Sequence, residues 1–182
     1  MYNRLQMKSI LSIVIPFLNE GVEVENTLIS IFNHSNMKDI EVIVINDASD
    51  DGYNYKELVD KYNIIFIENH TRIGVAASRD KGAQLSSGKY ILFLDAHMRF
   101  YDSDWSQRII DLLSSDQMLL LCSQSKGLCK INHEVCEIKG RQVAYGTSIN
   151  FINSFRYLEC NWIYKDFNPS ENIVEIPCVF GA

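Results

Sequence analysis

The chain has 182 residues, of which 47% are hydrophobic and 22% are charged, a composition typical of one globular domain with a substantial core. Its formal net charge of -6 argues against a general nucleic-acid binder and against binding to anionic membranes. We therefore expect no nucleic-acid partner, and we expect any anionic ligand to be held locally by arginines, backbone amides or a metal ion.

The amino-terminal residues and the cysteines give no sign of secretion. Residues Met1 to Ile10 contain neither a long apolar run nor a small-residue cleavage signal, so we expect no transmembrane segment and a cytoplasmic location. The five cysteines are odd in number and form no C-x-x-C pair, which argues against a disulfide framework and against a zinc ribbon.

The first part of the chain alternates apolar strands with helical patterns. Residues Ser9 to Phe17 form a nearly continuous apolar run, typical of a strand covered on both faces, and Pro16 is expected to end its pairing. Apolar residues at helical spacing follow, with Glu23 and Glu25 in the opening turn, where the helix dipole favours acids. A second buried strand is predicted at Ile40 to Ile45.

The same alternation continues to residue 123. A dense polar cluster, Asn46 to Gly52, follows the second strand, and part of it is expected to cap a helix at about Tyr53 to Tyr62. Further strands and helices are predicted, in chain order, at Ile64 to Glu68, Val75 to Leu85, Tyr90 to Asp95, Asp104 to Leu113 and Gln117 to Ser123. This order predicts an α/β fold with a mostly parallel, nucleotide-binding sheet flanked by helices.

The last third of the chain has a weaker pattern. Lys126 to Ala144 alternates enough to predict hairpin strands, for instance at Val135 to Lys139, and Tyr145 to Asn168 is rich in aromatic residues without a clear period. A last strand is predicted at Ile173 to Phe180, at the very end of the sequence. We expect one domain over 1–182, with a nucleotide-binding half at about 9–123 and, at 124–182, the incomplete start of an acceptor-side half that is small, irregular and antiparallel.

An acid and an imidazole stand at the end of the strand predicted at Tyr90 to Asp95. In an extended segment residues i and i+2 point the same way, so Asp95 and His97 can present an oxygen and a nitrogen to one metal ion, with open positions left for substrate oxygens. Taken alone, the pair is better described as a loop acid that caps the next helix, beside a solvent-exposed histidine.

Three strand ends deliver polar groups to one expected crevice. They are Pro16 to Glu20, Asn46 to Asp51, and Asp95 with His97, and the carboxyl ends of parallel strands are where such sheets bind nucleotides. No G-x-G-x-x-G follows the first strand and no P-loop motif occurs, so a divalent ion is the natural partner for a diphosphate.

Several segments resemble one known family. SIVIPFLNE, EVIVINDASDDG, TRIGVAASRDKGAQLSSGKYILFLDAH, ECNWIYKD and IPCVFGA are similar to the GT-A glycosyltransferases of family 2 type. The nearest resemblance is to the polypeptide N-acetylgalactosaminyltransferase branch, whose metal motif is also Asp-x-His. It implies a GT-A (Rossmann-like) fold, a nucleotide-sugar donor, expected to be a UDP-sugar, and Mn²⁺ (or Mg²⁺) as cofactor.

The resemblance also implies roles for individual residues. Asp95 and His97 match the metal motif, Asp47 matches the acid that accepts from the nucleobase, and Arg72 with Gly74 matches the segment that contacts the diphosphate. Glu20 and Ala96 belong to the same strand ends and join the predicted donor-binding set. The remaining matches are Pro16, Phe17 and Leu18 beside the nucleobase, and Gly181 and Ala182 beside the donor sugar.

Each of these residues has a plain structural alternative. Pro16 can simply end a strand, Asp47 can cap a helix, and Arg72 can be a solvated charge. Gly74 and Gly181 can be ordinary turn residues.

Three functions remain open on the sequence. The first is a metal-dependent transferase that moves a sugar from a nucleotide-sugar to an unknown saccharide, lipid-linked or protein acceptor. The second is a nucleotide-sugar-binding module without turnover because the acceptor half is missing. The third, a sugar-phosphate nucleotidyltransferase, is disfavoured because PFLNEG does not supply the glycine-rich basic loop that this chemistry uses. No acid is selected as the catalytic base, so the catalytic residue is unknown at this stage.

Overall fold

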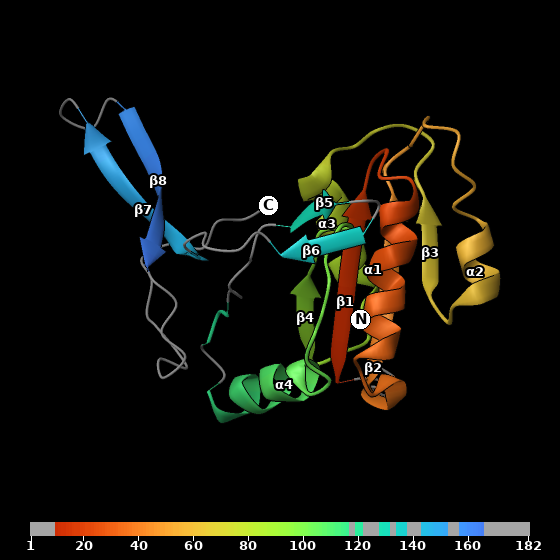
Figure 1. Ribbon diagram of the computed structural model, residues 1–182, viewed down its shortest axis with the longest axis horizontal. Helices are drawn as coiled ribbons and strands as arrows, with labels where there is room; N and C mark the ends of the chain where they lie inside the picture. The colour runs from red at the N-terminus through yellow and green to blue at the C-terminus, as the bar shows by residue number, and fades with distance from the viewer. Residues whose placement is uncertain are drawn as a thin grey trace, which may run out of the picture. The chain divides into compact units, whose positions relative to one another are not determined.

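The computed structural model describes residues 10–116, 119–121, 128–131, 134–137, 143–152 and 157–165 (Figure 1). The chain forms two compact units, Met1–Leu119 and Leu120–Ala182. The first unit carries the parallel sheet and all of the helices in the described residues.

The sheet of the first unit has four parallel strands in the order β3-β2-β1-β4. Their arrowheads point the same way where Figure 1 shows β1, β3 and β4. The two central strands are buried along nearly their whole length, as expected for apolar, β-branched runs covered on both faces. The strands are β1 (Leu11–Phe17), β2 (Ile40–Asn46), β3 (Ile65–Glu68) and β4 (Tyr90–Phe93).

Helices lie on both faces of this sheet. One core joins β1 residues such as Ile13 to Leu28 of α1 and to Ile110 of α4, and a smaller one contains Val14, Ile43 and Ile45 on the opposite face. The helices are α1 (Val22–Asn33), α2 (Glu57–Lys61), α3 (Val75–Leu85) and α4 (Trp105–Ser115), with a short 3₁₀ turn η1 (Met37–Asp39). The predicted α/β architecture is confirmed.

Gly82 sets how closely α3 approaches the sheet. A Cβ atom at this position would overlap the side chain of Val14 and would stand 2.9 Å from Cδ1 of Ile45. Because glycine has no side chain, the α3 backbone can pack directly on β1 and β2. The start of α3 is thereby held close to the carboxyl ends of these strands.

Pro16 does not end the first strand, in contrast to the prediction. β1 pairs with β2 through Phe17↔Asn46, one residue beyond the proline. The Val14 carbonyl accepts from Leu94 on the β4 side and the Phe17 carbonyl accepts from Asp47 on the β2 side, so the missing N–H of Pro16 faces the β4 side. The pairing with β4 ends at Val14↔Phe93, so Pro16 lies just beyond that ladder, at a position where a strand tolerates proline.

Other boundaries differ from the predictions at their ends. β4 stops at Phe93, two residues before Asp95. The helix predicted at Tyr53 to Tyr62 is shorter than expected, because α2 covers only five residues in the carboxyl-terminal half of that range. Within the range predicted as a fifth strand, 119–121 is described and is not in a strand. The strand predicted at Ile173 to Phe180 lies outside the described residues.

The second unit contains two antiparallel pairs, as the prediction of hairpin strands required. β5 (Leu128–Ile131) pairs with β6 (Glu134–Glu137), and β7 (Val143–Ile152) pairs with β8 (Tyr157–Lys165). The longer pair is irregular between Ala144 and Gly146. Within the described residues, no helix combines the length and apolar character needed to cross a membrane.

Candidate functional site

The carboxyl ends of β1, β2 and β4 meet at a pocket of about 240 Å³. Nine of its lining residues were predicted from the sequence as site residues: Pro16, Phe17, Leu18, Glu20, Asp47, Arg72, Asp95, Ala96 and His97. Two others, Val75 and Ser78, come from the start of α3 and were not predicted. Gly74 is next to the lining, while Gly181 and Ala182 lie outside the described residues.

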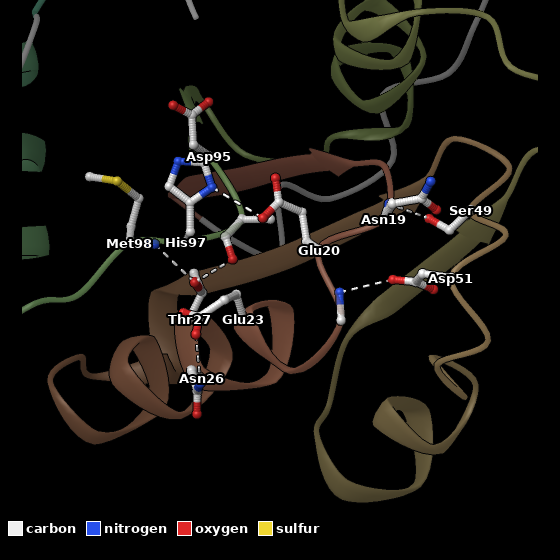
Figure 2. A network of polar contacts seen from close by, with 12 residues as sticks. Asn19, Glu20, Glu23, Asn26, Thr27, Ser49, Asp51, Asp95, His97 and Met98 are labelled. Atoms are coloured by element: carbon white, nitrogen blue, oxygen red, sulfur yellow. Dashed lines mark hydrogen bonds and ion pairs between the residues drawn. The ribbon is translucent and has the colours of Figure 1, made fainter. Parts of the chain in front are cut away.

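The loops that follow β1 and β2 are joined by side-chain hydrogen bonds. The Asn19 N–H donates to Oγ of Ser49 at 2.9 Å, its Nδ2 donates to Oδ1 of Asp50 at 2.8 Å, and its Oδ1 accepts from the Asp50 N–H. Figure 2 shows Asn19 and Ser49 facing each other from the two loops. Asn19 (φ 57°) and Ala48 (φ 63°) adopt the left-handed conformation, which the surrounding contacts must stabilise.

The Tyr55 hydroxyl makes a further link between these two loops. Its hydroxyl donates to Oδ2 of Asp51 at 2.5 Å and accepts from the Gly21 N–H at 2.6 Å. Burial raises the pKa of Tyr55 to about 12, and the hydrogen bond to Asp51 acts in the same direction. The Tyr55 ring packs against Phe17, with 4.5 Å between ring centroids, and this contact helps to hold the end of β1 in place.

Asp47 is the most firmly held acid at the pocket. It is only 4% exposed, yet Oδ1 accepts from Nδ2 of Asn69 and from the Ile73 N–H, each at 2.9 Å, and Oδ2 accepts from the Gly74 N–H at 2.8 Å. Burial alone would raise the pKa of Asp47, but the hydrogen bonds from Ile73, Asn69 and Gly74 outweigh it and lower the pKa below its ordinary value. The carboxylate therefore stays ionised and holds the loop that carries Arg72.

Asn69 links this carboxylate to α3. Its backbone N–H donates to the Asn46 carbonyl at 2.9 Å, and its side-chain oxygen accepts from Nζ of Lys81 at 2.6 Å. The lysine fixes the orientation of the Asn69 amide, so Nδ2 is directed at Asp47. Arg72 itself is exposed and lines the pocket, where its charge is available to an anion.

The Asp95–His97 segment is a turn after β4 and not an extended strand end. Oδ1 of Asp95 lies 3.4 Å from Nη2 of Arg79, and Nδ1 of His97 lies 3.3 Å from Oε2 of Glu20. Figure 2 shows the His97 ring turned toward the Glu20 carboxylate. Asp95 and His97 both line the pocket, as predicted. They do so from a turn, and not from the extended strand end that the sequence predicted.

Two hydroxyls of α1 hold the backbone that carries this turn. Thr27, fully buried, donates to the Ala96 carbonyl at 2.7 Å and accepts from the Met98 N–H at 3.0 Å (Figure 2). Ser30 pairs in the same manner with the N–H and carbonyl of Phe100. Thr27 was not predicted as a site residue, because nothing in the local pattern of an amphipathic helix indicates a hydrogen-bond partner 69 residues away.

Asp95 and His97 have the donor chemistry of a divalent metal site, an oxygen and an imidazole nitrogen on one pocket. Among the described residues, no group of three or more His, Cys, Asp or Glu side chains is arranged to hold a metal ion. Two protein ligands of this kind would leave the other coordination positions of an ion to oxygens of a bound ligand.

Arg79 adds positive charge beside Asp95. Its side chain is 18% exposed, and its guanidinium carbon lies 5.8 Å from the centroid of the Phe93 ring. Its Nε is buried and has no hydrogen-bond partner among the residues that the structure describes. The side chain is therefore packed in place by the sheet while Nη2 is directed toward Asp95. The positive charge of Arg79 partly neutralises Asp95, which reduces the repulsion between that carboxylate and an incoming anion.

The family model and two curated relatives that match this chain are glycosyltransferases. The family model described as glycosyl transferase family 2 matches residues 12–134. Human polypeptide N-acetylgalactosaminyltransferase 14 is 30% identical over 113 residues, which are 61% of this chain and 20% of the relative. N-acetylgalactosaminyltransferase 7 of Drosophila melanogaster is 27% identical over 162 residues, 85% of this chain and 26% of the relative. The chain thus spans only about a quarter of these relatives.

Solved structures show the same fold. Staphylococcus aureus TarS 1-349 in complex with UDP-GlcNAc superposes with a TM-score of 0.52 at 18% identity, covering 59% of this chain and 32% of that chain. The mannosyltransferase PcManGT from Pyrobaculum calidifontis, in complex with GDP-Man and Mn²⁺, gives a TM-score of 0.53 at 20% identity, covering 57% and 32%. At these identities the likeness concerns the fold alone.

Proposed function

Because the chain belongs to glycosyl transferase family 2, we propose that it moves a sugar from a UDP-sugar donor to a saccharide, lipid-linked or protein acceptor. The observation that carries this proposal is a pocket at the carboxyl ends of three parallel strands, lined by nine residues of the expected donor set. Such a crevice is where open α/β sheets bind nucleotides.

The nucleoside part of the donor is assigned to Asp47 and the end of β1. The Asp47 carboxylate lines the pocket and its pKa is lowered, and an ionised carboxylate is an acceptor only, so it suits a base N–H. Pro16, Phe17 and Leu18 supply the adjoining apolar wall. An acceptor at this position suits the N3–H of uracil, which supports the choice of a uridine nucleotide.

The diphosphate is assigned to Arg72 and to the metal motif. Asp95 and His97 would hold Mn²⁺ or Mg²⁺, and the ion would supply charge neutralisation at the leaving diphosphate. Arg72 contributes a further positive charge from the pocket lining, and Nη2 of Arg79 contacts Asp95. The chain itself is net acidic, so these local groups carry the recognition of an anionic ligand.

The domain organisation and the acceptor side belong to the proposal as well. We assign the donor to the half at about 9–123 and the acceptor to the half that begins at about 124. PcManGT, crystallised with GDP-Man and Mn²⁺, supports a metal-dependent nucleotide-sugar reaction on this fold, and the human and fly relatives by their names act with N-acetylgalactosamine. No residue is assigned as catalytic base.

Replacing Arg72 tests the assignment of the diphosphate. We expect Arg72→Ala to weaken UDP binding about tenfold, the effect of losing one charge-assisted hydrogen bond, and to leave uridine binding unchanged. GDP should bind the parent chain more weakly than UDP. Calorimetric titrations of UDP, GDP and uridine, all with Mn²⁺, measure these differences.

Arg108→Ala is the matched control. This arginine is exposed on α4 and is paired with Asp102 and Asp104, so its loss should not change UDP binding. Equal weakening of uridine and UDP by Arg72→Ala would contradict the diphosphate assignment.

Release of UDP from a UDP-sugar separates the transferase from the binding module, because the module would bind the donor and leave it intact.

A further inference from the structure

Glu20 faces the metal motif from the loop after β1 and lines the same pocket. Its Oε2 lies 3.3 Å from Nδ1 of His97 (Figure 2). The Glu20 and His97 side chains are 31% and 55% exposed, and both line the pocket, so the contact lies at the solvent-exposed rim of the site. We propose that Glu20 is a positioning residue that accepts the Nδ1–H of His97 and so leaves Nε2 as the nitrogen presented to the metal.

The loop that carries Glu20 is rigid on both sides of this residue. Asn19 and Gly21 flank it with φ of 57° and 52°, a conformation that glycine adopts freely but that needs support from neighbouring groups at Asn19. Asn19 is held by Ser49 and Asp50, and the Gly21 N–H donates to Asp51 at 3.1 Å and to Tyr55. The Glu20 backbone is therefore fixed by the loop that follows β2.

The backbone of His97 is fixed just as firmly. The buried Thr27 hydroxyl bonds to the carbonyl of the residue before it and to the N–H of the residue after it. With the backbone held on both sides, rotation of the His97 side chain is the freedom that is left. The Glu20 carboxylate removes this freedom by binding one ring nitrogen.

The choice of ring nitrogen follows from histidine chemistry. A neutral imidazole carries one N–H, and the hydrogen bond made by one nitrogen decides which nitrogen is free to bind a metal. Metal-binding histidines commonly donate their other N–H to a carboxylate, and removal of that carboxylate weakens metal binding by about 10–100-fold. Glu20 provides such a carboxylate on an independent element.

This inference rests on the proposed donor site, and the test separates the two. In the metal-free chain at about pH 8.5, where imidazole is neutral, the ¹⁵N shifts of His97 should report the Nδ1–H tautomer. Glu20→Ala should remove this preference, whereas Glu20→Gln, whose amide oxygen still accepts, should retain most of it. His97→Ala assigns the signal among the four histidines.

The same variants are titrated with Mn²⁺ in the presence of UDP. Glu20→Ala should weaken Mn²⁺ binding by about 10–100-fold, Glu20→Gln should recover most of the loss, and the exposed Glu57→Ala should have no effect. Equal loss in both Glu20 variants would identify a direct metal ligand and overturn the proposal, as would an unchanged tautomer. If the parent chain binds no Mn²⁺ with UDP, the donor site fails and the tautomer alone decides the role of Glu20.

Discussion

Asp47→Asn should destabilise the first unit by about 2–4 kcal/mol, because a buried carboxylate that accepts three hydrogen bonds is replaced by an amide with one acceptor. Whichever way the amide is oriented, its NH₂ group faces at least one of the donors from Asn69, Ile73 or Gly74. Urea unfolding followed by Trp105 fluorescence, in a Trp162→Phe background, measures the loss in the first unit.

The same substitution changes how stability depends on pH. The pKa of Asp47 is lowered below its ordinary value of 3.8, so its ionised form contributes stability that is fully present above about pH 4 and is lost as the pH falls through the folded-state pKa. The difference between parent and variant should therefore be largest at neutral pH and shrink below pH 4. A difference that grows on acidification would contradict this account.

Asp111→Asn is the control for Asp47→Asn. Asp111 is exposed on α4, and its side chain accepts from Nε2 of Gln107, which an amide oxygen can also do. We expect a change within about 0.5 kcal/mol at every pH. A similar loss in both variants would mean that charge alone, and not the buried hydrogen bonds of Asp47, is responsible.

Thr27→Val should cost about 3 kcal/mol, since the isosteric valine leaves the Ala96 carbonyl and the Met98 N–H without their buried partner. Thr27→Ser keeps the hydroxyl and loses one methyl group, which should cost about 1 kcal/mol. The two variants are compared by urea unfolding with the same fluorescence signal. Equal stability of the serine and valine variants would show that the hydroxyl does not hold the turn.

The sequence predicts much of the donor pocket because parallel strands bring their carboxyl ends to one edge of the sheet. Asp47 and Arg72 stand next to predicted strand ends, and the pocket contains both. The fold class and the family were likewise predicted, and both are confirmed.

The parts that the sequence did not predict depend on contacts between distant segments. Thr27 and Ser78 are buried hydroxyls on helices, and their partners are set by how each helix packs on the sheet. Pro16 stays within β1 because its missing N–H faces β4, and the pairing with β4 has already ended at Val14. β4 ends before Asp95, since the Thr27 hydroxyl pairs with the backbone around Ala96 where a strand partner would otherwise be needed.

The central claim is that the pocket binds a nucleotide-sugar through a metal held by Asp95 and His97. The most direct test is calorimetric titration of UDP into the purified chain with Mn²⁺ and with EDTA, beside an Asp95→Ala, His97→Ala double variant. We predict saturable binding with Mn²⁺, and binding at least tenfold weaker both in EDTA and in the variant, a loss of about 1.4 kcal/mol or more. UDP binding of equal strength in all three conditions, by a folded sample, would contradict the claim.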